Sequence, residues 1–246
     1  MPIHDFTSER LFVDAPLKAG GTVTCKPEQV NYLVNVLRLK AGAELLVFNG
    51  RDGEWRARLE PGGKRSAQLE VLAETRPQTV GPDLDYLFAP LKHARLDYMV
   101  QKATEMGARR LRPVLTRHTI AGRVNLDRMR ANAIEAAEQC GVLSVPDVME
   151  PGKLMTVLDH WEPSRTLIFC DEGAAVANPV EALATVPAGP LAVLIGPEGG
   201  FSQEERAAIA AKPFVRRISL GPRILRADTA AVAALAVVNA VLGDWR

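Results

Sequence analysis

Two similar strand–loop–helix units lie close together near the end of this 246-residue chain. Two apolar runs, Leu191–Ile195 and Phe214–Leu220, each end at a glycine and lead into a short loop. The first loop reads Gly-Pro-Glu-Gly-Gly over residues 196–200, and the second reads Gly-Pro-Arg-Ile-Leu-Arg over residues 221–226. Because open α/β folds bind ligands at the carboxyl ends of their strands, the two loops are predicted to hold a ligand.

The first loop differs from the glycine-rich loops that bind phosphate. It lacks the GxGxxG spacing, no Lys-Ser or Lys-Thr pair follows it, and Glu198 would repel a phosphate. The missing spacing also argues against a nucleotide-dependent oxidoreductase. Gly199 and Gly200 permit positive φ angles and leave room for a ligand against the backbone. A turn without a ligand is the alternative, and a neutral or cationic ligand fits this loop better than phosphate.

The second loop carries two large apolar residues, Ile224 and Leu225, between arginines. They either fill the core or form an apolar wall around an adenine ring. Asp228 follows, where it can cap the last helix and neutralise an arginine in a purely structural role. That helix, predicted at residues 229–242, is apolar on almost all sides, so it is expected in the core or against a second subunit.

The chain before these units shows two different patterns. Residues 1–76 are predicted to form a strand-rich, β-barrel-like domain with one short helix after Lys26, and the segment 75–82 is the predicted boundary. From residue 77 onward, strands alternate with helices, which is typical of a mostly parallel sheet covered on both faces. The fold class is therefore α/β, with predicted domains at residues 1–76 and 77–246.

Individual elements follow from apolar periodicity and turn residues. The capping box Ser202/Glu205 predicts a helix that begins at Gln203. Further strands are predicted at residues 10–13, 44–48, 54–59, 68–72, 84–89, 111–115 and 166–170, and further helices at residues 96–106, 127–139 and from about 179. In the helix after Lys26, Val30, Leu33, Val34 and Leu37 are predicted to point inward.

Composition excludes several classes of protein. The cysteines at positions 25, 140 and 170 lie far apart without a His/Cys cluster, so neither a metal site nor a disulfide framework is expected. The N-terminus lacks the pattern of a secretory signal, and no apolar run is long enough to span a bilayer. A cytoplasmic protein without a membrane or DNA partner is therefore expected.

The net charge of +1 is uninformative, but its distribution is uneven. Residues 81–130 hold ten Lys and Arg residues against five Asp and Glu residues. Between Arg109 and Arg130 there are seven arginines and a single acid, Asp127. This basic band, residues 109–130, could contact RNA phosphates; a solvated surface is the alternative.

The segments IGPEGGFSQEE and LGPRILRADTA together closely resemble the signature motifs of the SPOUT methyltransferases. Within these enzymes they are most similar to the ribosomal RNA small subunit methyltransferase E family. The resemblance extends upstream through Lys92, through residues 101–107 and 133–139, and through residues 10–13 and 32–38. It therefore covers nearly the whole chain.

The resemblance implies a fold, a reaction and a cofactor. It implies an N-terminal PUA-like RNA-binding domain and a C-terminal SPOUT-type domain that ends in a deep trefoil knot. It also implies a homodimer that methylates N3 of a uridine in 16S ribosomal RNA of the small subunit, with S-adenosylmethionine held in a bent shape by the two loops. The cofactor-binding residues that it implies are Leu194, Ile195, Gly196, Glu198, Gly199, Gly200, Leu220, Gly221, Ile224, Leu225 and Arg226. Among them, Ile195, Leu220, Ile224 and Leu225 are expected to pack on the adenine ring.

Roles in catalysis follow from the chemistry of uridine. N3 must lose its proton before it can attack a methyl group, so a base or a cation that stabilises the uridine anion is needed. Arg226 is the candidate cation, and Glu198 or Asp228 is the candidate base, although each carboxylate also has a structural alternative. The residues expected to contact RNA are Arg10, Arg38, Lys92, Lys102, Arg117 and Arg123.

Two other functions remain open at this stage. One is a SPOUT methyltransferase that acts on another RNA position, such as a ribose 2′-O of tRNA. The other is an RNA-binding protein without activity, in which the loops are inert turns.

Overall fold

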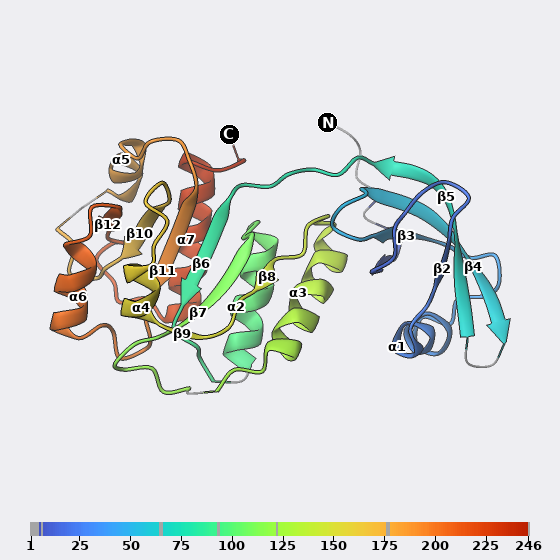
Figure 1. Cartoon of the computed structure of the whole chain (residues 1–246), viewed down its shortest axis with the longest axis horizontal. Helices are drawn as coiled ribbons and strands as arrows, with labels where there is room; N and C mark the ends of the chain where they lie inside the picture. Colours follow the sequence, from blue (N-terminus) through green and yellow to red (C-terminus); the bar gives the residue numbers. More distant parts are fainter. Residues whose placement is uncertain are drawn as a thin grey trace. The chain divides into compact units, whose positions relative to one another are not determined.

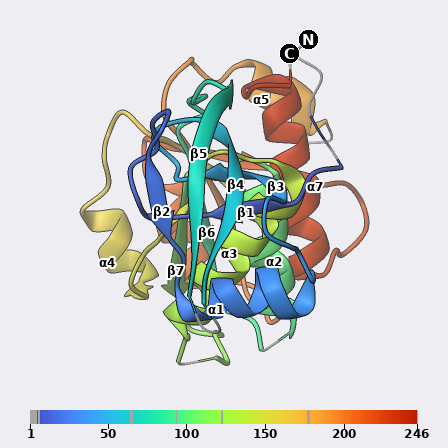
Figure 2. The ribbon, with the colours of Figure 1, turned by 90° about the vertical axis from the view of Figure 1, so that its right-hand side faces the viewer.

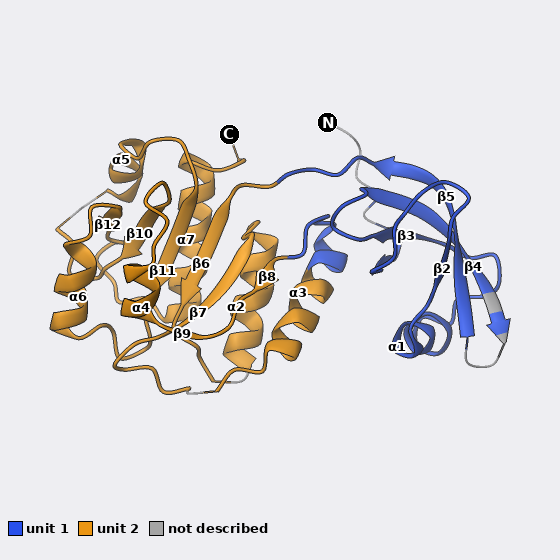
Figure 3. Ribbon diagram, in the orientation of Figure 1, with its two compact units in different colours: residues 1–80, 137–145 blue, residues 81–136, 146–246 orange. Residues whose placement is uncertain are grey.

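The computed structural model describes residues 5, 7–63, 66–92, 94–121, 123–175 and 178–245. The chain forms two compact units (Figure 3): one comprises residues 1–80 and 137–145, and the other residues 81–136 and 146–246. The first unit thus includes a segment from the later part of the chain. A division into residues 1–76 and 77–246 remains a prediction.

The first unit is built on a five-stranded sheet in the order β1-β3-β4-β5-β2 (Figure 1). β1 runs parallel to β3, and the other neighbours are antiparallel. In Figure 2, β4 and β5 lie side by side as a long antiparallel pair. The elements are β1 (Arg10–Phe12), β2 (Thr22–Thr24), α1 (Pro27–Val30), the π-helix η1 (Asn31–Val36), β3 (Glu44–Phe48), β4 (Glu54–Gly63) and β5 (Ser66–Arg76).

The helix expected after Lys26 is divided between α1 and η1. Pro27 begins α1, where a missing backbone N–H costs nothing. Val30 and Leu33 are buried in the core as predicted. From Asn31 the winding is π-helical, so the face changes and Val34 is 39% exposed. The prediction that Val34 points inward, which assumed α-helical spacing, is therefore wrong.

A buried ion network stabilises the first unit. Glu54 at the start of β4 is 2% exposed and accepts hydrogen bonds from Arg10 Nε at 2.9 Å and Arg76 Nη2 at 2.6 Å. The hydroxyl of Thr75 donates to the same carboxylate at 2.8 Å. Burial alone would raise the pKa of Glu54, but the hydrogen bonds from Arg76, Thr75 and Arg10 outweigh it and lower the pKa.

The second unit is a parallel sheet in the order β12-β10-β11-β6-β7-β8, with β9 paired to β7. Every pair of neighbours is parallel, which confirms the predicted sheet. The strands are β6 (Leu84–Phe88), β7 (Arg110–Leu115), β8 (Asp147–Val148), β9 (Gly152–Lys153), β10 (Thr166–Cys170), β11 (Leu191–Ile195) and β12 (Val215–Ile218). The helices are α2 (Ala94–Glu105), α3 (Leu126–Cys140), α4 (Leu154–Asp159), α5 (Pro179–Ala184), α6 (Gln203–Ala210) and α7 (Ala227–Val241).

The central strands of this sheet are covered on both faces. Every residue of β6 and β11 is buried, as expected for parallel strands between helices. Leu87, Phe169 and Leu194 share one apolar cluster with residues of α4 and α6. α7 packs against β11 and α2. The predicted capping box is present, because Ser202 and Glu205 bond each other's backbone N–H groups at the start of α6.

The path of the chain between β11 and α7 positions the two loops. After β11 the chain passes through α6 to β12, which pairs with β10 on the side away from β11. The chain then returns as α7, which contacts β11. The chain therefore crosses β10 twice. The deep trefoil knot remains a prediction from the family resemblance.

Candidate functional site

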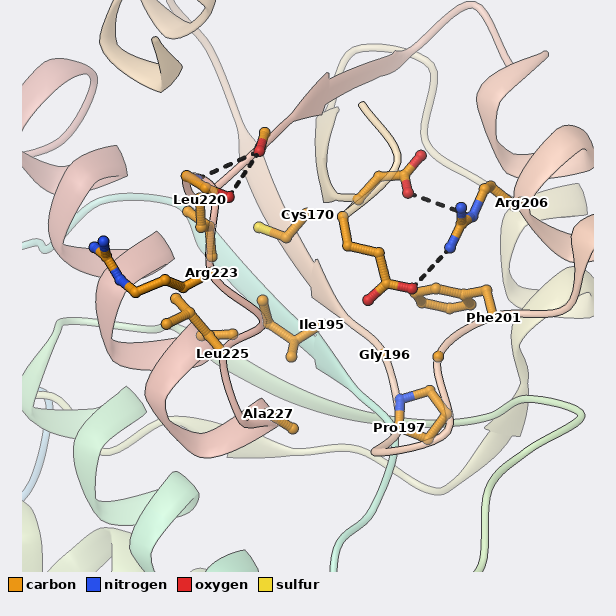
Figure 4. A pocket seen from close by; sticks show the side chains of 16 residues that line it. Cys170, Ile195, Gly196, Pro197, Phe201, Arg206, Leu220, Arg223, Leu225 and Ala227 are labelled. Carbon is orange, nitrogen blue, oxygen red and sulfur yellow. Dashed lines mark hydrogen bonds and ion pairs between the residues drawn. The ribbon is translucent and has the colours of Figure 1, made fainter. Parts of the chain in front are cut away.

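A cleft lies at the carboxyl ends of β10, β11 and β12, within the second unit (Figure 4). Its volume is about 640 Å³, including the part open to solvent. The residues that line it are Cys170, Asp171, Glu172, Ile195, Gly196, Pro197, Gly200, Phe201, Arg206, Ser219, Leu220, Gly221, Arg223, Leu225, Ala227 and Ala230.

One side of the cleft is apolar. Figure 4 shows Ile195, Leu220 and Leu225 gathered near Cys170. Burial raises the pKa of the Cys170 thiol to about 12, so the group is uncharged at neutral pH. A wall of aliphatic side chains and a neutral thiol suits a planar, uncharged ring.

The opposite side is charged. Arg206 extends from α6, with Nε 3.3 Å from Asp171 Oδ1 and Nη2 2.9 Å from Glu172 Oε1 (Figure 4). Asp171 is 3% exposed and is also bonded by Arg217 Nη2 at 2.7 Å. Asp171 therefore anchors the arginines, whereas Glu172 is the exposed carboxylate at the cleft.

The loop after β11 brings backbone close to a ring. The N–H of Gly200 donates to the carbonyl of Pro197 at 2.9 Å, and Gly200 has φ +66°, which favours glycine. A Cβ atom on Gly196 would lie 2.5 Å from the ring of Phe201. Phe201 in turn meets Phe169 edge-on, with ring centroids 5.1 Å apart. Gly196 is therefore required by its close contact with Phe201.

The loop after β12 separates its two apolar residues. Gly221 has φ +100°, which again favours glycine. Leu225 is half-buried and lines the cleft. Ile224 is 92% exposed and is not among the lining residues, so it neither fills the core nor faces this cleft. Ile224 instead lines an adjoining hollow that shares Glu172 and Arg223 with the cleft, so its packing on the adenine ring stays a prediction.

The two candidate bases are both paired with one arginine. Arg95 in the first turn of α2 forms an ion pair with Glu198, and its Nε lies 4.0 Å from Asp228 Oδ2. The N-cap position of α7 is occupied by Arg226, but Asp228 Oδ1 accepts the backbone N–H of Thr229 in the first turn at 2.9 Å. The predicted structural role of Asp228, bonding the start of the last helix and neutralising an arginine, is therefore observed.

The structure gathers some of the predicted cofactor residues and separates others. Leu194 is fully buried in the core, and Arg226 is exposed at the start of α7. The predicted residues that line the cleft are Ile195, Gly196, Gly200, Leu220, Gly221 and Leu225. Those outside its lining are Leu194, Glu198, Gly199, Ile224 and Arg226.

Sequence reasoning missed the charged side of the cleft. Asp171 and Glu172 directly follow the buried strand β10, and Arg206 lies within α6. The signal was the pair of carboxylates at the end of a strand, because carboxyl ends of neighbouring parallel strands meet at one edge. The position of Arg206 on the helix had no comparable signal.

The residues expected to contact RNA differ in their exposure. Arg10 is 6% exposed and bonded to Glu54, so its prediction as an RNA contact is wrong: a buried, paired guanidinium cannot reach RNA. Lys102 is half-buried, 2.6 Å from Glu105, and lies over the ring of Tyr98. The exposed members of the set are Arg38, Lys92, Arg117 and Arg123.

Ion pairs neutralise much of the basic band. Arg110 and Arg112 each place Nε 2.5 Å from the fully buried carboxylate of Asp85. Arg128 Nη2 lies 2.6 Å from Asp97 Oδ2, and Arg130 Nη1 lies 3.0 Å from Asp127 Oδ1. Six of the seven arginines of the basic band therefore lie within 4.0 Å of a carboxylate.

Within the described ranges, no group of three or more His, Cys, Asp or Glu side chains is arranged to hold a metal ion. No helix in those ranges is long and apolar enough to cross a membrane.

The chain matches two family models. One, for an RNA methyltransferase domain, matches residues 79–239, and the other, for an RNA methyltransferase PUA domain, matches residues 26–72. Curated relatives include ribosomal RNA small subunit methyltransferase E from Rickettsia conorii, 29% identical over 94% of this chain and 94% of the relative. The protein of the same name from Synechocystis is 33% identical over 95% of this chain and 78% of the relative.

Solved structures of similar proteins agree with these matches. A ribosomal RNA small subunit methyltransferase E from Neisseria gonorrhoeae, bound to S-adenosylmethionine, superimposes with a TM-score of 0.86. It is 27% identical, and the match covers 97% of this chain and all of the other. A putative methyltransferase from Legionella pneumophila, also in complex with S-adenosylmethionine, has a TM-score of 0.85 at 28% identity, over 96% of this chain and 99% of the other.

Proposed function

This chain belongs to the ribosomal RNA small subunit methyltransferase E family, and from that premise we propose that it methylates N3 of a uridine in 16S ribosomal RNA. The coarser activity, S-adenosylmethionine-dependent methylation of ribosomal RNA, follows from family membership. The choice of uridine N3 is our proposal and is supported by the resemblance of both loop motifs. We further propose that the enzyme works in the cytoplasm, on the small subunit or its RNA.

The observation that carries the proposal is the cleft between the two motif loops. Its residues fit S-adenosylmethionine chemically: Ile195, Leu220 and Leu225 would hold the adenine ring. The exposed carboxylate of Glu172 suits the ammonium group of the methionine part, and Arg223 suits its carboxylate. A cleft with both charges matches a ligand that is cationic at sulfur and zwitterionic at its amino acid end.

The chain's own residues would prepare the acceptor. When bound, S-adenosylmethionine supplies an electrophilic methyl group, and transfer then needs alignment more than covalent catalysis. Arg226 is exposed beside Leu225 at the start of α7, where its guanidinium would stabilise the uridine anion. Glu198 or Asp228 would accept the N3 proton.

Holding the RNA is a separate task. We propose that Arg38, Lys92, Arg117 and Arg123, which are exposed, contact phosphates. A uridine inside folded RNA must leave its stack to reach the cleft, and phosphate contacts on both sides of it would hold the splayed strand.

The decisive experiment uses small subunits from cells that lack this methylation. They are incubated with the protein and with labelled S-adenosylmethionine, and the modified nucleotide is then mapped in the 16S RNA. We expect one uridine that carries a methyl group on N3. A label on a ribose 2′-O would refute the N3 assignment, and S-adenosylmethionine binding without any label on RNA would refute the reaction.

We also propose that the protein forms a homodimer through α7. One face of this helix carries only small residues: Thr229 and Ala240 are exposed, and Ala233 and Ala236 are half-buried. Small side chains allow two helices to approach closely, and an apolar helix face of this kind favours a partner.

The dimer proposal predicts the effect of a charge on that face. Ala236→Glu would place a carboxylate in the interface and shift the protein from dimer to monomer, as measured by light scattering after size-exclusion chromatography. Ala207→Glu, at an exposed alanine of α6, is the matched control and would leave the mass unchanged. A wild-type protein that is monomeric at micromolar concentration would refute the proposal.

A further inference from the structure

Arg95 lies between two carboxylates that belong to different segments, a loop and the start of a helix. Its Nη1 forms an ion pair with Oε1 of Glu198 in the loop 196–200, and its Nε lies 4.0 Å from Oδ2 of Asp228 in the first turn of α7. Arg95 and Glu198 are 103 residues apart in the chain. The three side chains, Arg95, Glu198 and Asp228, are 35%, 47% and 19% exposed. Arg95 therefore joins, through its charge, the two segments that frame the cleft.

Folding stability does not explain this bridge. Ion pairs between partly exposed side chains add little to stability, because water screens them and holding long side chains costs entropy. The positions of the three charged groups account for the ion pairs of Arg95 instead. Glu198 and Asp228 carry like charges at the same edge of the cleft and would repel each other, whereas the planar guanidinium of Arg95 offers donors in two directions.

A second tether holds the first loop from another side. Nδ1 of His118, in the connection between β7 and α3, lies 3.1 Å from the carbonyl oxygens of both Gly199 and Gly200. This contact fixes the loop 196–200 to that connection. The link from the loop to the start of α7 runs through Arg95.

We propose that Arg95 is a positioning residue that couples the loop 196–200 to the start of α7, so that both walls of the cleft are held together. The inference rests on the proposed function only in assigning the cleft to S-adenosylmethionine. A ligand that enters a preformed cleft loses less affinity to the ordering of the loops. Arg95 thus increases cofactor affinity without contact with the cofactor.

The first test measures backbone hydrogen exchange in the free protein. Arg95→Met would accelerate exchange by about fivefold, the order expected for an ion pair of this kind, in peptides that cover residues 196–203 and 226–233. Arg95→Lys keeps the positive charge but loses the planar guanidinium that donates in two directions, so it would accelerate exchange less. The matched control is Arg130→Met, which removes an exposed ion pair within α3 (3.0 Å to Asp127) and would leave both peptides unchanged. Unchanged exchange in Arg95→Met would overturn the proposal.

The second test is a double-mutant cycle between the loop 196–200 and the start of α7. Glu198→Gln would accelerate exchange in residues 226–233, although Glu198 belongs to the loop and not to the helix. In the Arg95→Met background the same substitution would have no further effect, because the coupling is already lost. Equal effects in both backgrounds would overturn the coupling.

Calorimetry with S-adenosylmethionine separates this inference from the proposed function. The dissociation constant would rise about fivefold in Arg95→Met and be unchanged in Arg130→Met. A wild-type protein that fails to bind S-adenosylmethionine would refute the proposed function, while the exchange rates would still decide the role of Arg95.

Discussion

Burial and neighbouring charges have opposite effects on the ionisation of Glu54. The carboxylate is almost completely buried, and Arg10, Thr75 and Arg76 bond it. Burial opposes ionisation, yet these bonds lower its pKa below the ordinary value of 4.5. A carboxyl group with a lowered pKa stabilises the fold above its ordinary pKa, and the contribution is lost as the pH falls through the lowered value.

The substitution Glu54→Gln tests this network. It leaves two arginines without their carboxylate, so the free energy of unfolding at pH 7 would fall by about 3 kcal/mol. Because only the wild-type carboxylate can be protonated, the difference between the two proteins would shrink as the pH falls below 4.5. Urea unfolding at several pH values measures both effects. Glu60→Gln, at an exposed position of the same strand, is the control, and a difference that stays constant with pH would contradict the assignment.

Arg226 is the residue whose catalytic role is most directly testable. Its side chain is exposed and is not among the residues that line the cleft. Arg226→Ala would therefore leave the dissociation constant of S-adenosylmethionine within about threefold and reduce methyl transfer roughly 100-fold, the usual cost of losing one group that stabilises an anion. Calorimetry and a filter assay with labelled cofactor measure the two quantities. Unchanged turnover on small subunits would rule out this role.

Single residues were the least predictable part of the site. Arg10 and Arg38 are both arginines near apolar runs, yet one is buried against Glu54 and the other is exposed with φ 56°. Which of them pairs with a carboxylate depends on contacts more than 40 residues apart in the chain. The different exposure of Ile224 and Leu225 was equally unpredictable, because adjacent loop residues have no periodicity that assigns the directions of their side chains.

At the scale of elements, the local sequence pattern was sufficient to place a strand or helix wherever an apolar run was bounded by turn residues. The strands at 44–48, 166–170 and 191–195 have the predicted bounds, and α6 begins at Gln203. The strands β2, β8 and β9 were missed because two or three residues are too few to show alternation. The helix α4, with six residues, was missed for the same reason.

Gly196 connects the end of β11 to the shape of the cleft. The substitution Gly196→Ala would force a methyl group against Phe201, which must then leave its contact with Phe169. Overpacking of this kind usually costs about 1–3 kcal/mol. Since Phe201 lines the cleft, the dissociation constant of S-adenosylmethionine would rise at least about tenfold, as measured by calorimetry.

The matched control for this substitution is Gly81→Ala. A Cβ atom on Gly81 meets nothing within 4 Å, and its φ is not positive. Binding should therefore stay at the wild-type level, with circular dichroism showing that both variants are folded. Equal binding by Gly196→Ala and wild type would show that Phe201 does not shape the cofactor site.

At the scale of the whole molecule, the first unit is not a continuous piece of chain. Residues 137–145 complete it: Leu143 packs against Phe48, and Gly141 accepts a hydrogen bond from Arg76 at 3.0 Å. Glu138 accepts another from the N–H of Phe12 at 2.8 Å. The sequence does not predict that the chain rejoins the first unit at residue 137, because the helical pattern of α3 runs across this residue without interruption.

A fragment of residues 1–80 would therefore be much less stable than the same unit in the full chain. Trp55 is the only tryptophan in this fragment, so its fluorescence during urea unfolding reports the unit directly. We expect a lower unfolding midpoint than in a fragment that carries residues 137–145 through a flexible linker. Equal midpoints would show that the returning segment contributes nothing to the stability of the unit.

The returning segment also sets an order of events during synthesis. The ribosome releases the chain from its N-terminus, and domains that are continuous in sequence can fold as soon as they emerge. Here the first unit cannot be completed until residue 145 has left the ribosome, and by then β6, α2, β7 and α3 have also emerged. The first unit is therefore completed only after the first strands and helices of the second unit have been made, and no fusion point before residue 145 would pass the first unit intact to another protein.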